Sequence, residues 1–442
     1  MSYPDNKSRS QALLERARKV LPGGNSRTTV YHGPYPIYAK SGAGATITDV
    51  DGVVRLDFLN NYTSLIHGHA HPATVAAVQG QIGHGFSFAH PTELEIALAE
   101  VITARVASVE QVRFANSGTE AVMTAIKAAR AFTGRGRIAK CEGLYHGSYD
   151  PVEVSLDPGP DAWGDGDPTP QAYWKGMDGG TMDGVVVLPF NDAAAVERIL
   201  APHASDLAAV IVDLMPNRAG LMPASEDFVR ALRDFTRAHG IVLIFDEVIT
   251  LRTESGGLQA KYGIAPDFTT MGKIIGGGFP IGAVGGSAEM MSVFDPTAGK
   301  PRLPHGGTFN ANPISMAAGL AAMQAWDGPA VTRLNALGEK AREIAREAFR
   351  KAEVPGQVTG SGSLLMLHPH QRELTGYRDA WRGPREKAMM GHLHHALIDE
   401  GVLISPTGLT ALSTPMGEAE VERYGEALTR ALQRVRDAGL VP

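Results

Sequence analysis

Residues 241–278 read IVLIFDEVITLRTESGGLQAKYGIAPDFTTMGKIIGGG, and this stretch decides the fold. Its first five residues are apolar, which predicts a strand buried on both faces, as in a parallel α/β sheet. Asp246 follows at the carboxyl end of that strand, where open α/β sheets bind their ligands. Lys273 stands between a second predicted strand, 268–271, and the glycines at 276–278. A lysine in this position projects its amine into a cleft while the glycines let the backbone turn sharply away.

An amine and a carboxylate at neighbouring strand ends fit the chemistry of pyridoxal phosphate (PLP). The amine forms a Schiff base with the cofactor's aldehyde, and the carboxylate keeps the pyridine nitrogen protonated so that the ring accepts electrons. The pair Lys273 and Asp246 therefore predicts a PLP site. An aspartate at a strand end is also often a helix cap, so the pair alone leaves a structural role open.

The composition indicates an enzyme rather than a nucleic-acid-binding or membrane protein. With 442 residues, 43% of them hydrophobic, the chain is long enough for two or three structural units. Its 41 basic and 47 acidic residues give a net charge of −6, which argues against nucleic acid or an anionic membrane as a partner. The single cysteine, Cys141, excludes an internal disulfide framework and fits a reducing compartment. The N-terminus lacks a signal-peptide pattern and the apolar runs are strand-sized, so we expect a soluble, cytoplasmic protein; no metal site is predicted.

Predicted strands and helices alternate from about residue 60 to 325, the pattern of a mostly parallel sheet covered by helices. The expected strands are 112–114, 138–141, 185–188 and 207–213. The expected helices are 119–133, closed by Gly134, and a helix capped by Ser225 that ends at His239. A helix at 8–20 and short strands at 37–40 and 45–48 come before this region, and helices at 333–351, 385–400 and 418–436 follow it. We therefore expect an α/β protein with a large domain at 61–329 and a smaller α+β domain built from 1–60 and 330–442.

Residues 156–184 are rich in Gly, Pro and Asp and show no periodic pattern. Irregular segments of this length in a compact domain usually form a lid or a subunit-contact loop. Disorder is the alternative interpretation.

A phosphate site is predicted where residues 115–120, ANSGTE, join a strand to a helix. Gly118 lets the backbone approach an anion, Ser117 and Thr119 offer hydroxyl donors, and the helix N-terminus adds free N–H groups. A capping box would give a similar string, so the motif alone is ambiguous. Tyr145 follows the next strand and can stack on a flat heterocycle, and Thr308 lies in a second glycine-hydroxyl turn suited to phosphate.

Five strings, in this order and spacing, resemble the class III aminotransferases of PLP fold type I: NSGTEA, YHG, FDEV, TTMGKIIGGG and GTFNANP. Within this family the sequence resembles the branch that contains glutamate-1-semialdehyde aminomutase and the β-amino-acid transaminases. Three motifs carry this resemblance: GKIIGGG, PGG at 22–24 and GHAHP at 68–72. The resemblance covers about residues 10–440. It implies a large domain with a mostly parallel seven-stranded sheet and an obligate homodimer with shared active sites.

The resemblance also implies roles for individual residues of the cofactor site. Lys273 matches the Schiff-base lysine, which also moves a proton between the substrate Cα and the cofactor, and Asp246 matches the partner of the pyridine nitrogen. Val248 is expected to pack under the ring, Tyr145 to cover its other face, and His146 to bind the cofactor beside it. The phosphate is expected to be held by three residues of the same chain and one from the partner of the dimer: Ser117, Gly118, Thr119 and Thr308.

Two departures from the family pattern concern the remaining ligands. Residues 213–217, DLMPN, replace the usual Glu-Pro followed by Gln or Asn, so Asn217 is only a candidate for the donor to the cofactor's 3-hydroxyl. In the 404–408 loop, Thr407 stands where the β-amino-acid transaminases carry an arginine for a carboxylate. Either Arg218 or Arg252 replaces that arginine, or the amino acceptor differs.

Two residues, Arg27 and Tyr62, are predicted to lie on the substrate side of the site. Arg27 resembles the N-terminal arginine with which β-phenylalanine transaminases hold a carboxylate, and a guanidinium makes two parallel hydrogen bonds to such a group. A surface arginine is the alternative interpretation. Tyr62 stands where the aminomutase carries a tryptophan, which favours the transaminases. One fixed arginine beside an apolar wall favours pyruvate-like acceptors, with amines or β-amino acids as donors.

Three functions remain open. A transaminase would move an amino group between an amine or amino acid and a 2-oxo acid by a ping-pong cycle. An aminomutase would isomerise one substrate and keep a diamine intermediate bound, and a closing lid at 156–184 would suit that reaction. A non-catalytic α/β module would not need both Lys273 and Asp246. The sequence favours the transaminase.

Overall fold

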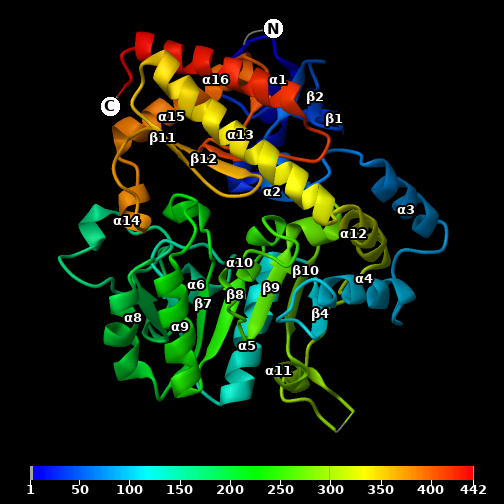
Figure 1. Ribbon diagram of the computed structural model, residues 1–442. Coiled ribbons are helices and arrows are strands. Elements are labelled where there is room, and N and C mark those ends of the chain that lie inside the picture. Colours follow the sequence, from blue (N-terminus) through cyan, green and yellow to red (C-terminus); the bar gives the residue numbers. More distant parts are fainter. Residues whose placement is uncertain (1–2, 298, 442) are drawn as a thin grey trace.

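The computed structural model, which describes residues 3–297 and 299–441, is built on a central seven-stranded sheet (Figure 1). In spatial order its strands are β4 (Gln111–Ala115), β10 (Gly282–Gly286), β9 (Phe268–Gly272), β8 (Val242–Asp246), β7 (Leu207–Val212), β5 (Arg137–Cys141) and β6 (Val185–Leu188). Strand β10 runs antiparallel to both of its neighbours, and the pairs from β9 to β6 are parallel. The predicted mostly parallel sheet of seven strands is therefore confirmed.

Alternate residues of the central strands enter two different hydrophobic clusters, which explains their uninterrupted apolar sequences. In β8, Val242 and Ile244 pack with helix α5 (Gly118–Thr133), whereas Leu243 and Phe245 pack with helix α9 (Glu226–His239) on the opposite face. Helix α8 (Ala193–Leu200) also contributes to the second cluster. Both faces of the sheet are covered, so ligands can reach it only at its edges.

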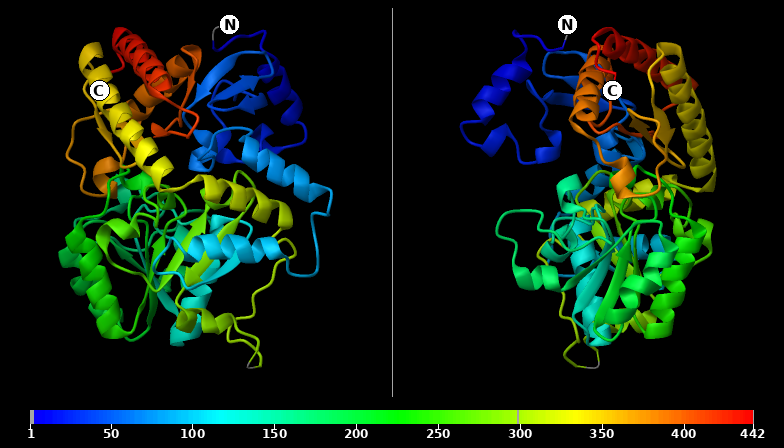
Figure 2. Two further views of the ribbon diagram at one scale, coloured as in Figure 1. Left: turned by 45° about the vertical axis from the view of Figure 1, so that its right-hand side comes forward. Right: turned by 90° about the vertical axis from the view of Figure 1, so that its left-hand side faces the viewer.

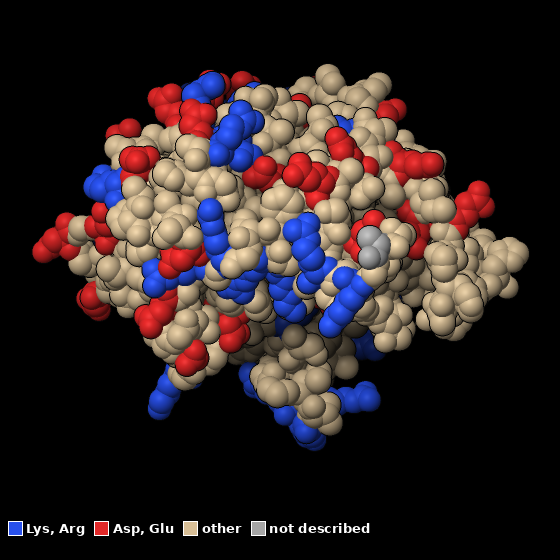
Figure 3. Space-filling model, turned by 90° about the horizontal axis from the view of Figure 1, so that it is seen from below, with Lys and Arg blue, Asp and Glu red and all other residues tan. Residues whose placement is uncertain are grey.

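The helix ends follow the predicted signals. Ser225 caps α9 by accepting a hydrogen bond from the backbone N–H of Phe228 (3.3 Å), and Gly134 ends α5 with a φ of +71°. At the ends of these helices Arg135 donates to backbone oxygens that include those of Leu207 and Gly240. Figure 3 shows Lys and Arg side chains gathered across the middle of the face below the large sheet. Because cations stabilise helix C-termini, we interpret the basic groups on this face as structural.

A second structural unit lies above the large sheet and contains both ends of the chain (Figure 2). One sheet joins β1 (Ala39–Ala43), β2 (Thr46–Asp49) and β3 (Val54–Asp57) to β13 (Val402–Leu403), and another joins β11 (Gln357–Thr359), β12 (Leu364–His368) and β14 (Leu409–Ala411). The helices of this unit are α1 (Arg9–Ala17), α13 (Gly328–Ala352), α14 (Tyr377–Ala380), α15 (Pro384–Asp399) and α16 (Glu418–Asp437). The parallel pairing of β3 with β13 brings the two termini together, as expected for the smaller α+β domain. The domain boundaries at residues 60 and 330 stay predictions.

Several predicted boundaries in this unit are wrong by a few residues. The first helix ends at Ala17 rather than at residue 20, because tighter i→i−3 bonds replace the helical pattern there: the N–H groups of Lys19 and Val20 donate to the oxygens of Arg16 and Ala17. Helix α13 begins at Gly328, five residues before the predicted start, because Asp327 caps it by accepting from the N–H of Ala330 (2.9 Å). The predicted strand at 37–40 begins at Ala39.

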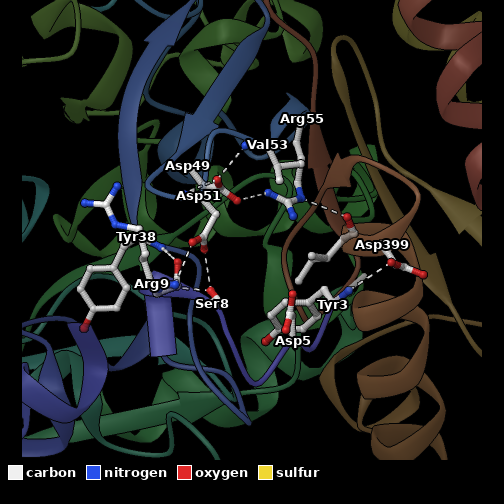
Figure 4. A network of polar contacts seen from close by, with 12 residues as sticks. Tyr3, Asp5, Ser8, Arg9, Tyr38, Asp49, Asp51, Val53, Arg55 and Asp399 are labelled. Carbon is white, nitrogen blue, oxygen red and sulfur yellow. Dashed lines mark hydrogen bonds and ion pairs between the residues drawn. The ribbon is translucent and has the colours of Figure 1, made fainter. Parts of the chain in front are cut away.

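The N-terminal segment is tied to the small unit by a network of polar contacts (Figure 4). The backbone N–H of Tyr3 donates to Asp399 (3.1 Å), and the hydroxyl of Ser8 donates to Asp51 (2.6 Å). Arg55, which is buried, donates to Asp49 and to the backbone oxygen of Ile398 (3.0 Å). This network fixes the start of the N-terminal strap, which we define as residues 18–38.

The irregular stretch 156–184 is held against α14 of the small unit. The hydroxyl of Tyr377 donates to Asp157 (3.1 Å), and Arg378 donates to Glu142 (2.7 Å) and to the backbone oxygen of Trp163 (3.2 Å). Short helices form at Pro160–Ala162 and α7 (Gly179–Asp183). The stretch is therefore placed by contacts with α14, and its role as a lid or a subunit contact stays a prediction. Among the described residues, none of the helices combines the length and the apolar character that a bilayer-spanning segment needs.

Candidate active site

The predicted site residues meet at the carboxyl edge of the large sheet. Asp246 is the last residue of β8, Lys273 follows β9 directly, and Ser117 lies two residues after β4. The side chain of Val248 lies beside both glycines of this edge: its Cγ1 would be 3.1 Å from a Cβ on Gly118 and 3.4 Å from one on Gly272. The motifs predicted to bind cofactor and phosphate are thus brought together.

Asp246 is buried and held by three hydrogen bonds. His146 Nδ1 donates to Asp246 Oδ2 (2.8 Å), while the hydroxyl of Thr270 and the backbone N–H of Val248 donate to Oδ1 (3.2 and 3.1 Å). Burial lowers the pKa of His146, and its hydrogen bond to Asp246 opposes that shift. The imidazole of His146 therefore orients the carboxyl group of Asp246 at the strand end.

A second buried carboxyl group lies beside Asp246 and was not singled out by sequence reasoning. Asp213 follows β7, the neighbour of β8 in the sheet. Burial raises the pKa of Asp213 well above its ordinary value, and the negative charge of Asp246 adds to the shift. Two carboxyl groups that share a site disfavour each other's ionisation, so Asp213 takes up a proton more readily than an exposed aspartate does. Its place after a parallel strand was the signal that could have identified it.

Lys273 has an unusual backbone conformation and a shifted pKa. Its φ is +49°, a left-handed value that a non-glycine residue adopts at a cost of about 1–2 kcal/mol. Burial lowers the pKa of Lys273, and the Arg27 guanidinium adds to this effect, whereas Asp246 and Asp213 oppose it. The amine is therefore more often neutral, and more nucleophilic, than an exposed lysine.

The loop from Asn116 to Thr119 has the features of an anion site. Ser117 Oγ caps the helix by accepting from the backbone N–H of Glu120 (3.2 Å), and Glu120 reaches back to accept from the N–H of Asn116 (2.6 Å), one residue before the N-cap, so the pattern is close to a capping box. The hydroxyl of Ser117 is left to donate to a ligand, and Thr119 Oγ1 accepts from the N–H of Ser148 (3.1 Å). A Cβ on Gly282 would collide with the backbone oxygen of Ser117, so a neighbouring strand sets the position of this loop. Helix capping and anion binding are compatible here, because the helix N-terminus faces the same edge.

Comparison with known proteins gives the family. The sequence profile of the class III aminotransferases matches residues 28–417. The chain belongs to this family. It is 40% identical over 431 residues to glutamate-1-semialdehyde 2,1-aminomutase of Ignicoccus hospitalis, covering 96% of this chain and 99% of that protein.

Solved structures of the same fold are also similar. The ω-transaminase from Sphaerobacter thermophilus is 56% identical, with a TM-score of 0.95 and coverage of 98% of this chain and 99% of that one. The β-phenylalanine aminotransferase from Variovorax paradoxus is 35% identical, with a TM-score of 0.85 and coverage of 95% and 93%. Class III aminotransferases are PLP enzymes, and a related transaminase has been solved with PLP bound. The predictions of fold type I, of an aminotransferase and of PLP as cofactor are confirmed.

The residues at the sheet edge fit the cofactor of this family. When bound, PLP supplies an aldehyde that condenses with amines and a pyridine ring that accepts electrons from the substrate Cα. The braced carboxylate of Asp246 suits the protonated ring nitrogen, and the amine of Lys273 suits the aldehyde. The glycine loop with Ser117 and Thr119 suits the phosphate, and any side chain at Gly118 would press on Val248. These assignments of individual residues stay proposals.

Three further predicted residues lie around this edge. Tyr145 is 45% exposed, so one face of its ring is free to cover a ligand. Asn217 is half-buried at the start of the short helix Asn217–Ala219, in the loop after β7. Thr308 is exposed, and its loop touches the phosphate loop through Asn310 Oδ1, which accepts from Asn116 Nδ2 (2.8 Å). An exposed Thr308 is free to meet a second subunit, as the resemblance implies.

The substrate side brings Arg27 and Tyr62 together. The Arg27 guanidinium lies 5.5 Å from the centroid of the Tyr62 ring, and its Nη1 donates to Asn61 Oδ1 (2.9 Å). The hydroxyl of Tyr62 donates to the backbone oxygen of Thr29 in the N-terminal strap. Burial raises the pKa of Tyr62, and Ser405 of the 404–408 loop acts on it in the opposite direction. Sequence reasoning missed Asn61 and Ser405, which no local motif marks.

The structure removes Arg252 from the candidates for a second carboxylate-binding cation. Its side chain is fully buried and donates to the backbone oxygens of Thr63 (3.0 Å) and Leu412 and to the hydroxyl of Ser363 (3.0 Å). Arg218 is committed as well, to Asp157 and to the backbone oxygen of Gly143 (3.1 Å). Of Arg27, Arg218 and Arg252, only Arg27 has no carboxylate or backbone oxygen bound to its guanidinium among the described residues, so it is the candidate that remains.

Proposed function

We propose that this class III aminotransferase is a transaminase that moves an amino group between an amine or β-amino acid and a 2-oxo acid. The observation that carries the proposal is the position of Arg27, which stacks on Tyr62 and acts electrostatically on Lys273. A cation that acts on the amine of Lys273 suits a carboxylate of the substrate. The 56% identity to an ω-transaminase, against 40% to an aminomutase, supports the same choice.

In the proposed reaction each buried group has one task. Lys273 takes up the proton from the substrate Cα and returns it on the cofactor side, because its lowered pKa leaves part of the amine neutral. Asp246 keeps a proton on the ring nitrogen, and His146 holds that carboxylate in place. Burial and the charge of Asp246 raise the pKa of Asp213, which favours its neutral form and weakens it as a competing anion.

The substrate class follows from the charge of the binding side. Arg27 can make two parallel hydrogen bonds to a carboxylate with the guanidinium edge that Asn61 does not use. The ring of Tyr62 gives an apolar wall beside it. We therefore propose pyruvate-like acceptors, with hydrophobic amines or β-amino acids as donors.

We also propose a cytoplasmic homodimer with shared active sites. Large apolar side chains are exposed around α3 (Pro72–Ile82), α4 (Glu93–Thr103) and α12 (Pro313–Ala325), on one side of the molecule in Figure 1: Val75, Ile82, Phe86, Phe88, Ile96, Phe279 and Phe309. Such a set is typical of a protein interface. Thr308 precedes the exposed Phe309, so covering this patch would bring Thr308 to the partner. Sedimentation should give twice the mass of the chain.

An aminomutase remains the second candidate, supported by the irregular stretch 156–184 that α14 holds as a potential lid. The two reactions differ in stoichiometry. A panel of amines and β-amino acids, each supplied with pyruvate or 2-oxoglutarate, should give amino-group transfer only when donor and acceptor are both present. Turnover of glutamate-1-semialdehyde alone, without any 2-oxo acid, would instead establish the isomerase.

A further inference from the structure

The turn that carries Asn61 and Tyr62 is strained along its whole length. Four consecutive non-glycine residues have left-handed φ values: Asn60 (+49°), Asn61 (+47°), Tyr62 (+55°) and Thr63 (+73°). Asparagine tolerates this conformation, but tyrosine and the β-branched threonine disfavour it. A turn of this kind persists only where surrounding contacts impose it, and such strain is typical of functional sites.

Two side chains outside the turn, those of Asp57 and Arg252, and one within it, that of Asn60, impose its conformation. Asp57 Oδ1 accepts from the backbone N–H of Leu59 (2.9 Å) and of Asn60 (3.0 Å). The amide of Asn60 donates to the backbone oxygen of Ala411 (2.8 Å). Arg252 Nη1 donates to the oxygen of Thr63 (3.0 Å), which closes the turn at its other end.

Arg252 is an unusual choice for this contact. Its guanidinium is fully buried, and within residues 3–297 and 299–441 its acceptors are two backbone oxygens and a hydroxyl rather than a carboxylate. A buried charge without an opposite charge is expensive unless every donor is used. The acceptors belong to three segments that are far apart in sequence, at Thr63, Ser363 and Leu412. Arg252 also lies only six residues after Asp246, so the same loop serves the cofactor side.

The turn in its strained form orients the carboxylate-binding arginine. Asn61 Nδ2 donates to Ser64 Oγ (3.1 Å), which directs Asn61 Oδ1 towards the Arg27 guanidinium (2.9 Å). The ring of Tyr62 supports the guanidinium, whose Cζ lies over it at 5.5 Å from the ring centroid. Relaxation of the turn would remove both contacts together.

We propose that Arg252 is a positioning residue for substrate recognition: it holds the left-handed turn 60–63 so that Asn61 and Tyr62 keep Arg27 oriented for a substrate carboxylate. This inference rests on the proposed transaminase function for its substrate. Its mechanical part, the clamping of the turn, does not depend on that function.

The test uses the holoenzyme with Arg252→Met, which removes the donors, and Arg252→Lys, which restores part of them. The matched control is Arg342→Met, because Arg342 is also buried and donates to the backbone oxygens of Gly362 (2.8 Å) and Leu364 (2.9 Å) without touching the turn. Amide hydrogen exchange of a peptide covering 58–66 reads the turn directly, since the N–H groups of Thr63 and Leu65 are bonded within it. We expect exchange there to be about tenfold faster in Arg252→Met and unchanged in Arg342→Met.

Steady-state kinetics measure how the change in the turn affects substrate binding. With pyruvate as acceptor and 1-phenylethylamine as donor, Arg252→Met should raise the KM for pyruvate about tenfold and leave the KM for the amine within about twofold. Arg252→Lys should fall between the wild type and Arg252→Met. Should Arg252→Met not fold, Asn61→Gly replaces it: glycine relieves the strain but removes the acceptor for Arg27, so the KM for pyruvate should rise without loss of stability.

Unchanged exchange at 58–66, or an equal rise in both KM values, would overturn the proposal. An effect of Arg342→Met as large as that of Arg252→Met would overturn it as well, because it would reduce Arg252 to a general stability role. If the wild type transferred no amino group between any pair of substrates, the proposed function would fail, and the exchange experiment would still decide whether Arg252 clamps the turn.

Discussion

The cofactor side and the substrate side of this active site are built in opposite ways. On the cofactor side, each group follows the end of a strand in one sheet: Ser117 after β4, Lys273 after β9 and Asp246 at the end of β8. On the substrate side, Arg27 lies in the N-terminal strap and Asn61 in a left-handed turn, and the loop with Ser405 comes from the other end of the chain. None of these residues lies at the end of a strand of the large sheet.

The difference lies in what sets the geometry. Backbone hydrogen bonds between neighbouring strands of the large sheet align the cofactor groups, and buried residues on both sides of β8 keep the alignment rigid. In the turn 60–63 the left-handed backbone conformation costs about 1–2 kcal/mol per residue. Long-range contacts such as that of Arg252 must offset this strain. We infer that the cofactor side tolerates little change, whereas the substrate side is where specificity can be altered.

The largest expected effect is on the cofactor side, from Lys273→Ala. Without the amine that moves the proton at the substrate Cα, turnover should fall about 10⁴-fold or more. Borohydride reduction of the wild-type holoenzyme followed by peptide mapping should label Lys273. The informative competitor is Lys140, which is fully buried, donates to the backbone oxygen of Val154 (2.8 Å) and has a pKa that burial lowers to about 7.

Labelling of Lys140 instead of Lys273 would contradict the assignment of the cofactor side, because the edge of the large sheet would then hold no catalytic amine. Exposed Lys261 serves as the internal standard for non-specific reduction. A purified protein that is colourless and does not bind added PLP would lead to the same conclusion.

A smaller but still large effect is expected from Gly282→Ala. The new Cβ would collide with the backbone oxygen of Ser117, so the phosphate loop would have to move. Overpacking of this kind typically costs about 1–3 kcal/mol, which corresponds to a 5- to 150-fold weaker binding of PLP. Titration of the apoenzyme with PLP measures it. Gly136→Ala is the matched control, because a Cβ there meets no atom within 4 Å; equal affinities of the two variants would refute the role of Gly282.

The fold and the cofactor side could be predicted because their signals are local. Uninterrupted apolar runs such as 241–245 indicated strands buried on both faces, and the strand-end rule placed Lys273, Asp246 and the phosphate loop at one edge. Boundaries were less reliable, because side-chain caps set them: Asp327 starts α13 five residues earlier than the apolar pattern does.

The substrate side could be predicted only in part, through resemblance. The string NNYT shows asparagines that tolerate a left-handed φ, but only tertiary contacts with Ala411 and Arg252 make that conformation stable. Arg252 had a plausible sequence position for a ligand role, yet its burial among carbonyl groups excludes one. Asp213 could have been found by the strand-end rule, and the departure of its motif from the family pattern drew attention away from it.

On the substrate side, Arg27→Ala should raise the KM for carboxylate substrates about tenfold to a hundredfold, the value of a lost charge-assisted pair. The turnover number and the KM of a carboxylate-free amine should change little, since the arginine binds ground state and transition state alike. Arg302→Ala is the matched control, because Arg302 is also exposed and lies over an aromatic ring, that of Phe132 (5.3 Å), which is at the opposite end of α5 from Ser117. An unchanged KM for pyruvate in Arg27→Ala would contradict the carboxylate role.

The smallest effect on turnover concerns the histidines that hold the strap of Arg27. His32, in the strap, stacks edge-on against His394 of α15 (4.9 Å between centroids) and contacts the hydroxyl of Tyr3 (3.0 Å). Burial lowers the pKa of His394 to about 3 and that of His32 to about 4. In the unfolded chain both histidines take up a proton near their ordinary pKa of about 6.5, whereas in the folded chain they stay neutral to a lower pH. Acid therefore favours the unfolded chain, and the free energy of unfolding falls as the pH drops below about 6.5.

At pH 5 the protonation of His394 in the unfolded state alone should lower the free energy of unfolding by about 2 kcal/mol relative to pH 8. His394→Leu removes this titration, so its urea midpoint should fall less between pH 8 and 5 than that of the wild type, with turnover at pH 8 unchanged. His392→Leu, an exposed position on the same helix, should keep the wild-type pH dependence. If His394→Leu lost stability on acidification as steeply as the wild type, His394 would not be the cause of the acid sensitivity of the strap that carries Arg27. The strap would then rest on the contacts of Tyr3 and Ser8 with Asp399 and Asp51.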